Sequence, residues 1–318
     1  RIIAESAAGS PVYAVFYGDF SEEPHAANWS AASGSGDPAA YTGETGGGKQ
    51  TVLFLAGMHG AEAESVAAAV NLLEFMETGR DLRGRSHPEL AELLRQYRLI
   101  ILPCLNMDGR AISPDHLNGS TYEEFRRASQ GVWLDGSLIG WKGSKKFFPL
   151  PLDRVSYPGG YPNAAGVNIM HDATPGNIRS AEARGLLRLT EQYTVDLVLN
   201  GHSCEYPAMM FAPSEYNYGP NLRRGRELAR SVNDALLKAG LRREPYRISE
   251  KPDRSVNIDN LIPLTCGGLA LTLECNVYGP DFDTLVEPNF VALETLLREG
   301  LRKPFVDRKK LLSGIPEY

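Results

Sequence analysis

The chain has 318 residues, of which 42% are hydrophobic and 23% charged, values typical of a globular protein with a deep core. The formal net charge of −6 argues against nucleic acid and anionic membrane surfaces as partners. No apolar run approaches the roughly 18 residues that a membrane span requires. The chain opens at Arg1 rather than Met, as after removal of a leader segment or after trimming, and a secreted or periplasmic location is slightly favoured over a cytoplasmic one.

The first third of the chain alternates apolar strands with amphipathic helices. The pattern predicts strands over Pro11–Tyr17, Thr51–Ala56 and Arg98–Cys104, and helices over Ala61–Glu77 and His87–Tyr97. Residues 18–50 are rich in Gly, Ser, Ala and acidic residues, so we expect a long surface loop there. Residues 111–165 show no strong periodicity, and so long an excursion without structure in a compact domain is usually functional.

The same alternation continues to the end of the chain. It predicts strands over Thr194–Asn200, Ala208–Phe211 and Leu269–Glu274, and helices over Ser180–Tyr193, Asn221–Ala239, Val286–Leu301 and Pro304–Leu312. No internal repeat and no linker divides the chain, which indicates a single α/β domain over residues 1–318. Strands that alternate with helices in this way favour a mainly parallel or mixed sheet covered on both faces.

The four cysteines are widely spaced and form no CxxC pair, so neither a zinc ribbon nor a thioredoxin-like motif is present. They stand at Cys104, Cys204, Cys266 and Cys275. We expect them to be mostly free, buried, small apolar residues, and the formation of one disulfide is left open.

Polar side chains stand at the ends of three apolar strands. His59 and Glu62 follow the strand that stops at Gly57, His202 follows a second strand, and Glu274 ends a third. Ligands of open α/β sheets bind at this edge. Each residue alone has a simpler explanation, such as an acidic first-turn residue favoured by the helix dipole for Glu62. Together the four are far harder to explain in that way.

Two His and one Glu with an open fourth position form a catalytic zinc set rather than a closed structural one. We therefore expect one Zn²⁺ per chain, held by His59, Glu62 and His202. Such a metal polarises a carbonyl group and makes hydroxide available near neutral pH. Glu274 follows a run of apolar or small residues and has no obvious local partner, so it fits the base that takes a proton from water and returns it to the leaving amine.

The sequence resembles the zinc carboxypeptidase family of the carboxypeptidase A type over residues 6–302, nearly the whole chain. The matching motifs are SAAGSPVYAV near the start, HxxE at His59 and Glu62, the turn Pro103–Gly109, the step Gly166-Val167-Asn168, the pair His202-Ser203, and Leu271-Thr272-Leu273-Glu274. The resemblance implies the same three zinc ligands, Glu274 as general base, and an eight-stranded mixed, twisted sheet with helices on both faces. Asn168 stands where the family places a carboxylate behind the first zinc histidine, and its amide oxygen can still accept from the imidazole N–H and fix the tautomer.

The chain departs from the family where a free substrate carboxylate is bound. Met170-His171 replaces the family's Asn-Arg pair, and Ala61 stands where the HxxE motif of the family carries an Arg. The family's carbonyl-polarising Arg is replaced by Lys142, and Tyr246 is the nearest match to its mobile Tyr. An Arg grips a carboxylate with two hydrogen bonds in a way that His or Lys does not reproduce. We therefore expect an intact zinc site and a carboxylate-binding site that is made of different residues from those of the family.

We thus predict a zinc peptidase with altered substrate choice. Its substrate would be a peptide whose side-chain or D-configured carboxylate is read by His171 and Lys142, and bacterial cell-wall peptides are one such class. The aromatic side chains of Trp133, Trp141 and Tyr161 could line the entrance to the active site, or they could simply pack the loop of residues 111–165. Alternatives are a zinc deacylase of the aspartoacylase or succinylglutamate desuccinylase type, a zinc-containing peptide-binding module without turnover, and a structural domain. Glu274 argues against the binding module.

Overall fold

The computed structural model describes residues 1–20, 25–43, 48–213, 219–248, 256–278 and 281–308. Its centre is a six-stranded sheet in the order β3-β5-β4-β8-β10-β9. The strands are β3 (Val15–Tyr17), β4 (Thr51–Leu55), β5 (Arg98–Leu102), β8 (Leu197–Cys204), β9 (Met209–Met210) and β10 (Leu269–Asn276). The four inner strands are parallel, and the two edge strands run antiparallel to their neighbours. The predicted mixed sheet is confirmed.

The expected count of eight strands is wrong, because the remaining strands of the described residues form two separate ribbons. One pairs β1 (Ile2–Glu5) with β2 (Pro11–Tyr13), and the other pairs β6 (Val132–Trp133) with β7 (Val155–Tyr157). The strand predicted over Pro11–Tyr17 is divided at Ala14, whose N–H donates to the carbonyl of Arg1, and its two halves join different sheets. One apolar run therefore forms two short strands, because its two halves pair with different neighbouring strands.

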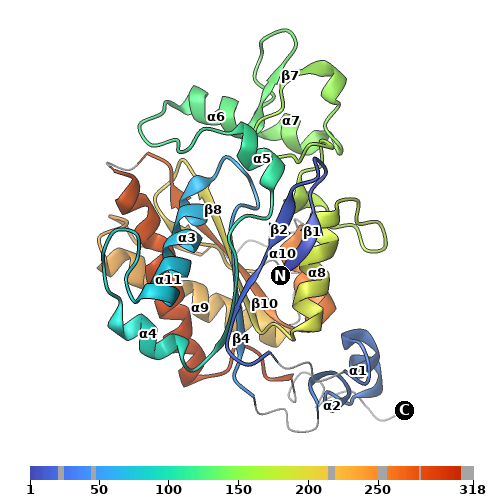
Figure 1. Cartoon of the computed structure of the whole chain (residues 1–318), viewed down its shortest axis with the longest axis vertical. Coiled ribbons are helices and arrows are strands. Elements are labelled where there is room, and N and C mark those ends of the chain that lie inside the picture. Colours follow the sequence, from blue (N-terminus) through green and yellow to red (C-terminus); the bar gives the residue numbers. More distant parts are fainter. Residues whose placement is uncertain (21–24, 44–47, 214–218, 249–255, 279–280, 309–318) are drawn as a thin grey trace.

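Helices cover both faces of the central sheet (Figure 1). One face packs against α3 (Ala63–Thr78), α4 (Pro88–Leu94), α9 (Gly219–Lys238) and α11 (Phe282–Arg302). The other packs against α1 (Trp29–Ser35), α8 (Ala181–Gln192) and α10 (Ile258–Cys266). Each face thus has its own apolar core, as expected for strands buried on both sides. None of the described helices is both long and apolar enough to span a bilayer.

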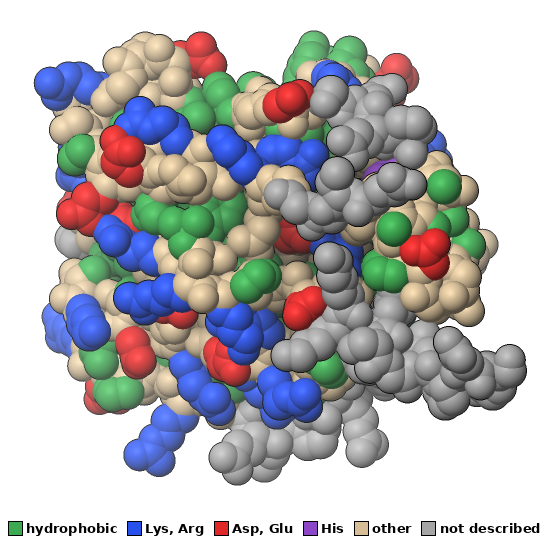
Figure 2. Space-filling view, turned by 90° about the horizontal axis from the view of Figure 1, so that it is seen from below, with side chains coloured by type: hydrophobic (Ala, Val, Ile, Leu, Met, Phe, Trp, Pro, Cys, Tyr) green, Lys and Arg blue, Asp and Glu red, His purple; other side chains and the backbone are tan. Residues whose placement is uncertain are grey.

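The two predicted long loops contain regular structure. Residues 18–50 include α1 and α2 (Ala39–Thr42). After α5 (Met107–Ile112), residues 111–165 form α6 (Tyr122–Gln130), β6, α7 (Gly140–Lys146), the short 3₁₀ turn η1 (Leu152–Arg154) and β7. This excursion lies above the carboxyl ends of the parallel strands, at the top of Figure 1. At the opposite end, in the view from below, basic and acidic side chains are interspersed (Figure 2).

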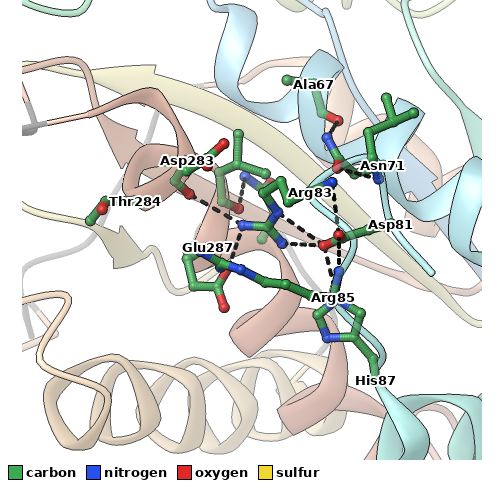
Figure 3. A network of polar contacts seen from close by, with 12 residues as sticks. Ala67, Asn71, Asp81, Arg83, Arg85, His87, Asp283, Thr284 and Glu287 are labelled. Atoms are coloured by element: carbon green, nitrogen blue, oxygen red, sulfur yellow. Dashed lines mark hydrogen bonds and ion pairs between the residues drawn. The ribbon is translucent and has the colours of Figure 1, made fainter.

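A network of charged residues joins the segment after α3 to the first turns of α11 (Figure 3). The Asp81 carboxylate accepts from the Arg83 guanidinium at 2.7 Å and lies 3.0 Å from His87 Nε2. The same guanidinium donates to Glu287 on α11 at 2.6 Å. Asp81 is 3% exposed, so this ion cluster fixes two helices of one face against each other from a largely buried position.

Further details differ from the sequence predictions. All four cysteines are free. Residues 304–307, the start of the helix predicted over Pro304–Leu312, are not helical, and residues 309–312 lie outside the described part. Helix α10 was not predicted, because Pro263 stands inside it and a proline normally argues against a helix interior.

Candidate metal centre

A tight turn after β4 carries the first two predicted ligands. Gly57 has φ +62°, and a Cβ there would lie 2.9 Å from Cys104 Cα, so only glycine fits. Gly60 lies even closer to its neighbours, because a Cβ would meet the backbone N of Arg110 at 2.0 Å. The turn ends at Glu62, which precedes α3. These close backbone contacts hold His59 and Glu62 above the carboxyl end of β4.

The structure brings the three predicted ligands together. The Glu62 carboxylate lies between two imidazoles, with His59 Nδ1 2.9 Å from Oε1 and His202 Nδ1 2.9 Å from Oε2. One ligand atom from each residue lies within 4.8 Å of the others. All three side chains are buried, at 5%, 2% and 3% exposed for His59, Glu62 and His202. Among the described residues, this is the group of His, Cys, Asp and Glu side chains that could hold a metal ion.

The neighbours of His59 favour metal binding through its Nδ1. Asn168 Oδ1 lies 3.3 Å from His59 Nε2, so it can accept that N–H and leave Nδ1 to face Glu62. The backbone N–H of Ser203 donates to Glu62 Oε2 at 3.1 Å. Asn168 therefore lies where the sequence predicted, behind the first histidine.

The electrostatics show that two imidazoles compete for one carboxylate. Burial raises the pKa of Glu62, but His59 and His202 lower it below the usual range. Burial lowers the pKa of His202, but Glu62 raises it above the usual range. Two nitrogens and a carboxylate that converge in this way match the donor set of a catalytic zinc site, in which a cation takes the place of the shared protons.

Glu274 lies next to His202 in the parallel pair β8–β10, where the two residues are register partners. Its Oε2 is buried and has no hydrogen-bond partner among the described residues. Burial is the largest influence on its pKa, which is raised; His202 opposes the shift and Glu62 adds to it. Since β-strand side chains alternate, Cys275 points away from the site and packs in the core beside Asn289, 3.2 Å from its Nδ2.

The predicted substrate-binding residues lie in different environments. Met170 and His171 belong to η2 (Ile169–His171), directly after Asn168. Met170 is only 7% exposed and packs in the core next to Asn200, so its side chain is not part of an open binding surface. His171 is half-buried; burial, then Lys145, His59 and His202 lower its pKa to about 3, so it is neutral at pH 7.

Lys142 and Tyr246 lie further out. Lys142 is exposed on α7. Tyr246 is half-buried, with its ring centre 6.3 Å from that of Phe211. Burial raises the pKa of Tyr246; the charge of Arg242 opposes this shift, and Cys204 and Glu274 add to it. The catalytic role of Lys142 and the binding role of Tyr246 stay predictions.

The excursion contributes Tyr161, which the sequence offered as a possible wall of the site, and Arg126, which sequence reasoning missed. Tyr161 stacks on His59 with ring centres 4.0 Å apart. Burial, Glu62 and Glu274 raise the pKa of Tyr161, whereas Gln130 and the charge of Arg126 on α6 lower it. Arg126 also pairs with Glu205. The capping box of Thr121 and Glu124, readable as TYEE, is the pattern that could have revealed α6.

A mixed sheet with a His-Glu-His cluster at its carboxyl edge and an acidic side chain beside it is an arrangement typical of metal-dependent hydrolases. The family model described as zinc carboxypeptidase matches residues 2–268, and the chain belongs to this family of zinc metallopeptidases. The match ends before Glu274. A comparison with curated protein sequences found no significant match.

Solved structures agree on the fold. The metallo-carboxypeptidase of Burkholderia cenocepacia is 16% identical with a TM-score of 0.58, and the match covers 95% of this chain and 64% of that one. The metallo-carboxypeptidase of Pseudomonas aeruginosa, in complex with (2-guanidinoethylmercapto)succinic acid, is 17% identical with a TM-score of 0.56, covering 95% and 64%. Thrombin activatable fibrinolysis inhibitor is 14% identical with a TM-score of 0.55, covering 95% and 69%. The chain thus spans less than two thirds of the length of the two bacterial carboxypeptidases and slightly more of the third protein.

Proposed function

We propose that the protein hydrolyses an amide bond of a peptide, with zinc held by His59, Glu62 and His202 and with Glu274 as general base. One observation carries the proposal: the Glu274 carboxyl lies beside His202 and keeps an unpaired, buried oxygen. An unpaired buried polar group costs free energy, and this oxygen beside the metal cluster is available to accept a proton from water.

The zinc ion, when bound, polarises the substrate carbonyl and acidifies water. The chain's own residues supply the rest. Glu274 accepts a proton from the attacking water and returns it to the leaving nitrogen. The raised pKa keeps the Tyr161 hydroxyl protonated, so it can donate to an oxygen that becomes negative, and the positive charge of Arg126 acts on the same hydroxyl.

The substrate class follows from the surroundings of the site. The Pseudomonas relative binds a succinic acid derivative, which supports a carboxylate-bearing, peptide-like ligand for this chain too. Met170 lies in the core and His171 is neutral, so the pair cannot form a bidentate, positively charged clamp. Altered specificity is therefore part of the proposal, with cell-wall peptides that carry D-amino acids or γ-glutamyl linkages as one class.

Library screening tests this function. Zinc-loaded protein is incubated with acylated peptides that include D-residues, γ-glutamyl linkages and acyl amino acids, and products are identified by mass spectrometry. We expect zinc-dependent hydrolysis that a chelator abolishes and added zinc restores. Cleavage of acyl amino acids alone would instead identify a deacylase. If the zinc-loaded protein binds peptides but cleaves none, it is a binding module and the proposal is wrong.

A further inference from the structure

The start of α3 carries two carboxyl groups that both bond to the end of β8. Glu62, which precedes the helix, accepts from the backbone N–H of Ser203 at 3.1 Å. Glu64, in the first turn of the helix, accepts from the Ser203 hydroxyl at 2.6 Å. Ser203 directly follows His202, a proposed metal ligand. The residue after this ligand is therefore held at its backbone by one carboxyl group and at its side chain by another.

The bond to Glu64 is made behind the metal site. Side chains alternate along a strand, so the Ser203 side chain points away from the face on which His202 meets Glu62. Its register partner Cys275 packs in the core that α3 and α11 cover. Glu62 thus contacts the end of β8 from the side of the metal site, and Glu64 contacts it from the side of the helices.

The surroundings of Glu64 are closed to water. The Glu64 and Ser203 residues are each 1% exposed, so solvent does not compete for their hydrogen bond. The other oxygen of Glu64, Oε1, is buried and has no hydrogen-bond partner among the described residues. Burial of a carboxyl group costs free energy, and a single hydrogen bond offsets only part of this cost. Glu64 is outside the His-Glu-His group that could hold the ion, so its printed contact with the site passes through Ser203.

We infer that Glu64 is a positioning residue of the metal centre. Its bond to the Ser203 hydroxyl fixes the end of β8, and with it the imidazole of His202 and the backbone N–H that Glu62 accepts. Groups that hold metal ligands from behind set the orientation of these ligands, and metal affinity falls when they are removed. The inference rests on the ligand set of the proposed function and extends it to a residue that the ion does not touch.

Zinc affinity tests the inference without any substrate. Zinc-free protein competes with a chromophoric chelator for zinc, and the dissociation constant is compared among variants. Ser203→Ala removes the donor of the bond and Glu64→Leu removes the acceptor, so each should raise the constant roughly 10- to 100-fold. Glu64→Gln keeps an oxygen that accepts the hydroxyl and should stay close to the parent. The double variant Glu64→Leu/Ser203→Ala should bind no more weakly than the weaker single variant, because both changes remove one bond.

A control separates positioning from stability. Asn71 lies about two turns further along α3, where its buried side chain bonds to the carbonyl of Ala67 and the N–H of Leu82. Asn71→Leu should lower the melting temperature of the zinc-free protein and leave the zinc dissociation constant unchanged. Melting temperatures of all zinc-free variants are measured alongside. If Glu64→Leu does not fold, Ser203→Ala decides, because it removes a single hydroxyl group.

The outcomes discriminate. An unchanged zinc affinity in Ser203→Ala overturns the inference, as does a double variant in which the two losses multiply. A loss in Asn71→Leu as large as that in Ser203→Ala also overturns it, because the effect would then follow from stability alone. If the affinities change as expected but the zinc-loaded parent cleaves no peptide, the proposed function alone is refuted.

Discussion

Glu274 and His202 are register partners in the parallel pair β10–β8, so a proposed base and a metal ligand from distant parts of the chain are neighbours in one sheet. Parallel partners share a face, and both strands are held by a regular hydrogen-bonded ladder. The relative position of the two side chains is therefore set by the rigid centre of the sheet. Loops contribute the remaining groups of the site, but they do not set this distance.

Replacement of the base tests the central chemical step. In Glu274→Gln the side chain keeps its size but cannot accept a proton, so we expect the turnover rate to fall by roughly 10²- to 10⁴-fold. Zinc content should stay near one ion per chain, because Glu274 is outside the ligand set. Both quantities are measured on the same preparation. Glu123→Gln, an exposed change on α6, serves as the control, and a Glu274→Gln protein with undiminished turnover would falsify the assignment.

Loss of a ligand tests the metal site. His202→Ala removes one of two imidazole nitrogens and leaves an open site with two ligands, so bound zinc should fall from about one to less than about 0.1 per chain after dialysis. The melting temperature should then no longer rise when zinc is added, since binding to the folded state is the source of that stabilisation. His116→Ala, an exposed histidine outside the cluster, should keep its zinc. Full zinc occupancy in His202→Ala would show that the ion binds elsewhere.

The turn that carries His59 is sensitive to a single methyl group. A Cβ at Gly60 would lie 2.0 Å from Arg110 N and 2.1 Å from Gly109 C, which are backbone atoms that cannot move aside without shifting α5. We expect Gly60→Ala to lower the free energy of unfolding by at least about 3 kcal/mol or to prevent folding. At Gly34, in α1, no atom lies within 4 Å of the added group, so Gly34→Ala should stabilise by about 0.5 kcal/mol. Urea denaturation compares the two, and equal midpoints would contradict the expected crowding.

Acid stability depends on Asp81. Burial alone raises its pKa, but His87, the backbone N–H of Arg85 and the side chain of Arg83 lower it from 3.8 to about 2 in the folded state. A carboxylate with a depressed pKa stabilises the fold above the unfolded value and loses this contribution as the pH falls from near 4 through about 2. Asp81→Asn should therefore cost roughly 2 kcal/mol at neutral pH and progressively less as the solution is acidified.

Urea midpoints measured from neutral to acidic pH check this dependence. The exposed Asp153→Asn is the control, which should track the parent at every pH. If the deficit of Asp81→Asn is the same at both ends of the range, the contribution of Asp81 does not come from its ionisation.

The inner strands could be predicted from the sequence because each is an apolar run that ends in a glycine or a polar turn. The boundaries were less certain: β8 was expected over Thr194–Asn200 but runs from Leu197 to Cys204, because its pairing with β10 continues past His202. The excursion was predicted to lack structure because α6 and α7 are short and polar. The stability of α6 depends on its capping box, and both helices depend on packing above the sheet. Hydrophobic periodicity reveals neither of these contributions.

The metal ligands were readable for a related reason. A polar residue at the end of an apolar strand stands out in sequence, and parallel topology brings such ends together at one edge of the sheet. The hydrogen bond from Ser203 to Glu64 could not be read in this way. It depends on how the first turn of α3 is placed against the end of β8, and this placement follows from tertiary packing rather than from any local pattern.

The order of the sheet has a consequence for biosynthesis. Strands β4, β8 and β10 are adjacent in space, yet β10 is made long after β4, and β8 fills the position between them. A growing chain that has reached His202 therefore carries the three proposed zinc ligands but still lacks Glu274, the proposed base on β10. Under the proposed function, the base joins the metal ligands only after β10 has been synthesised and has paired with β8.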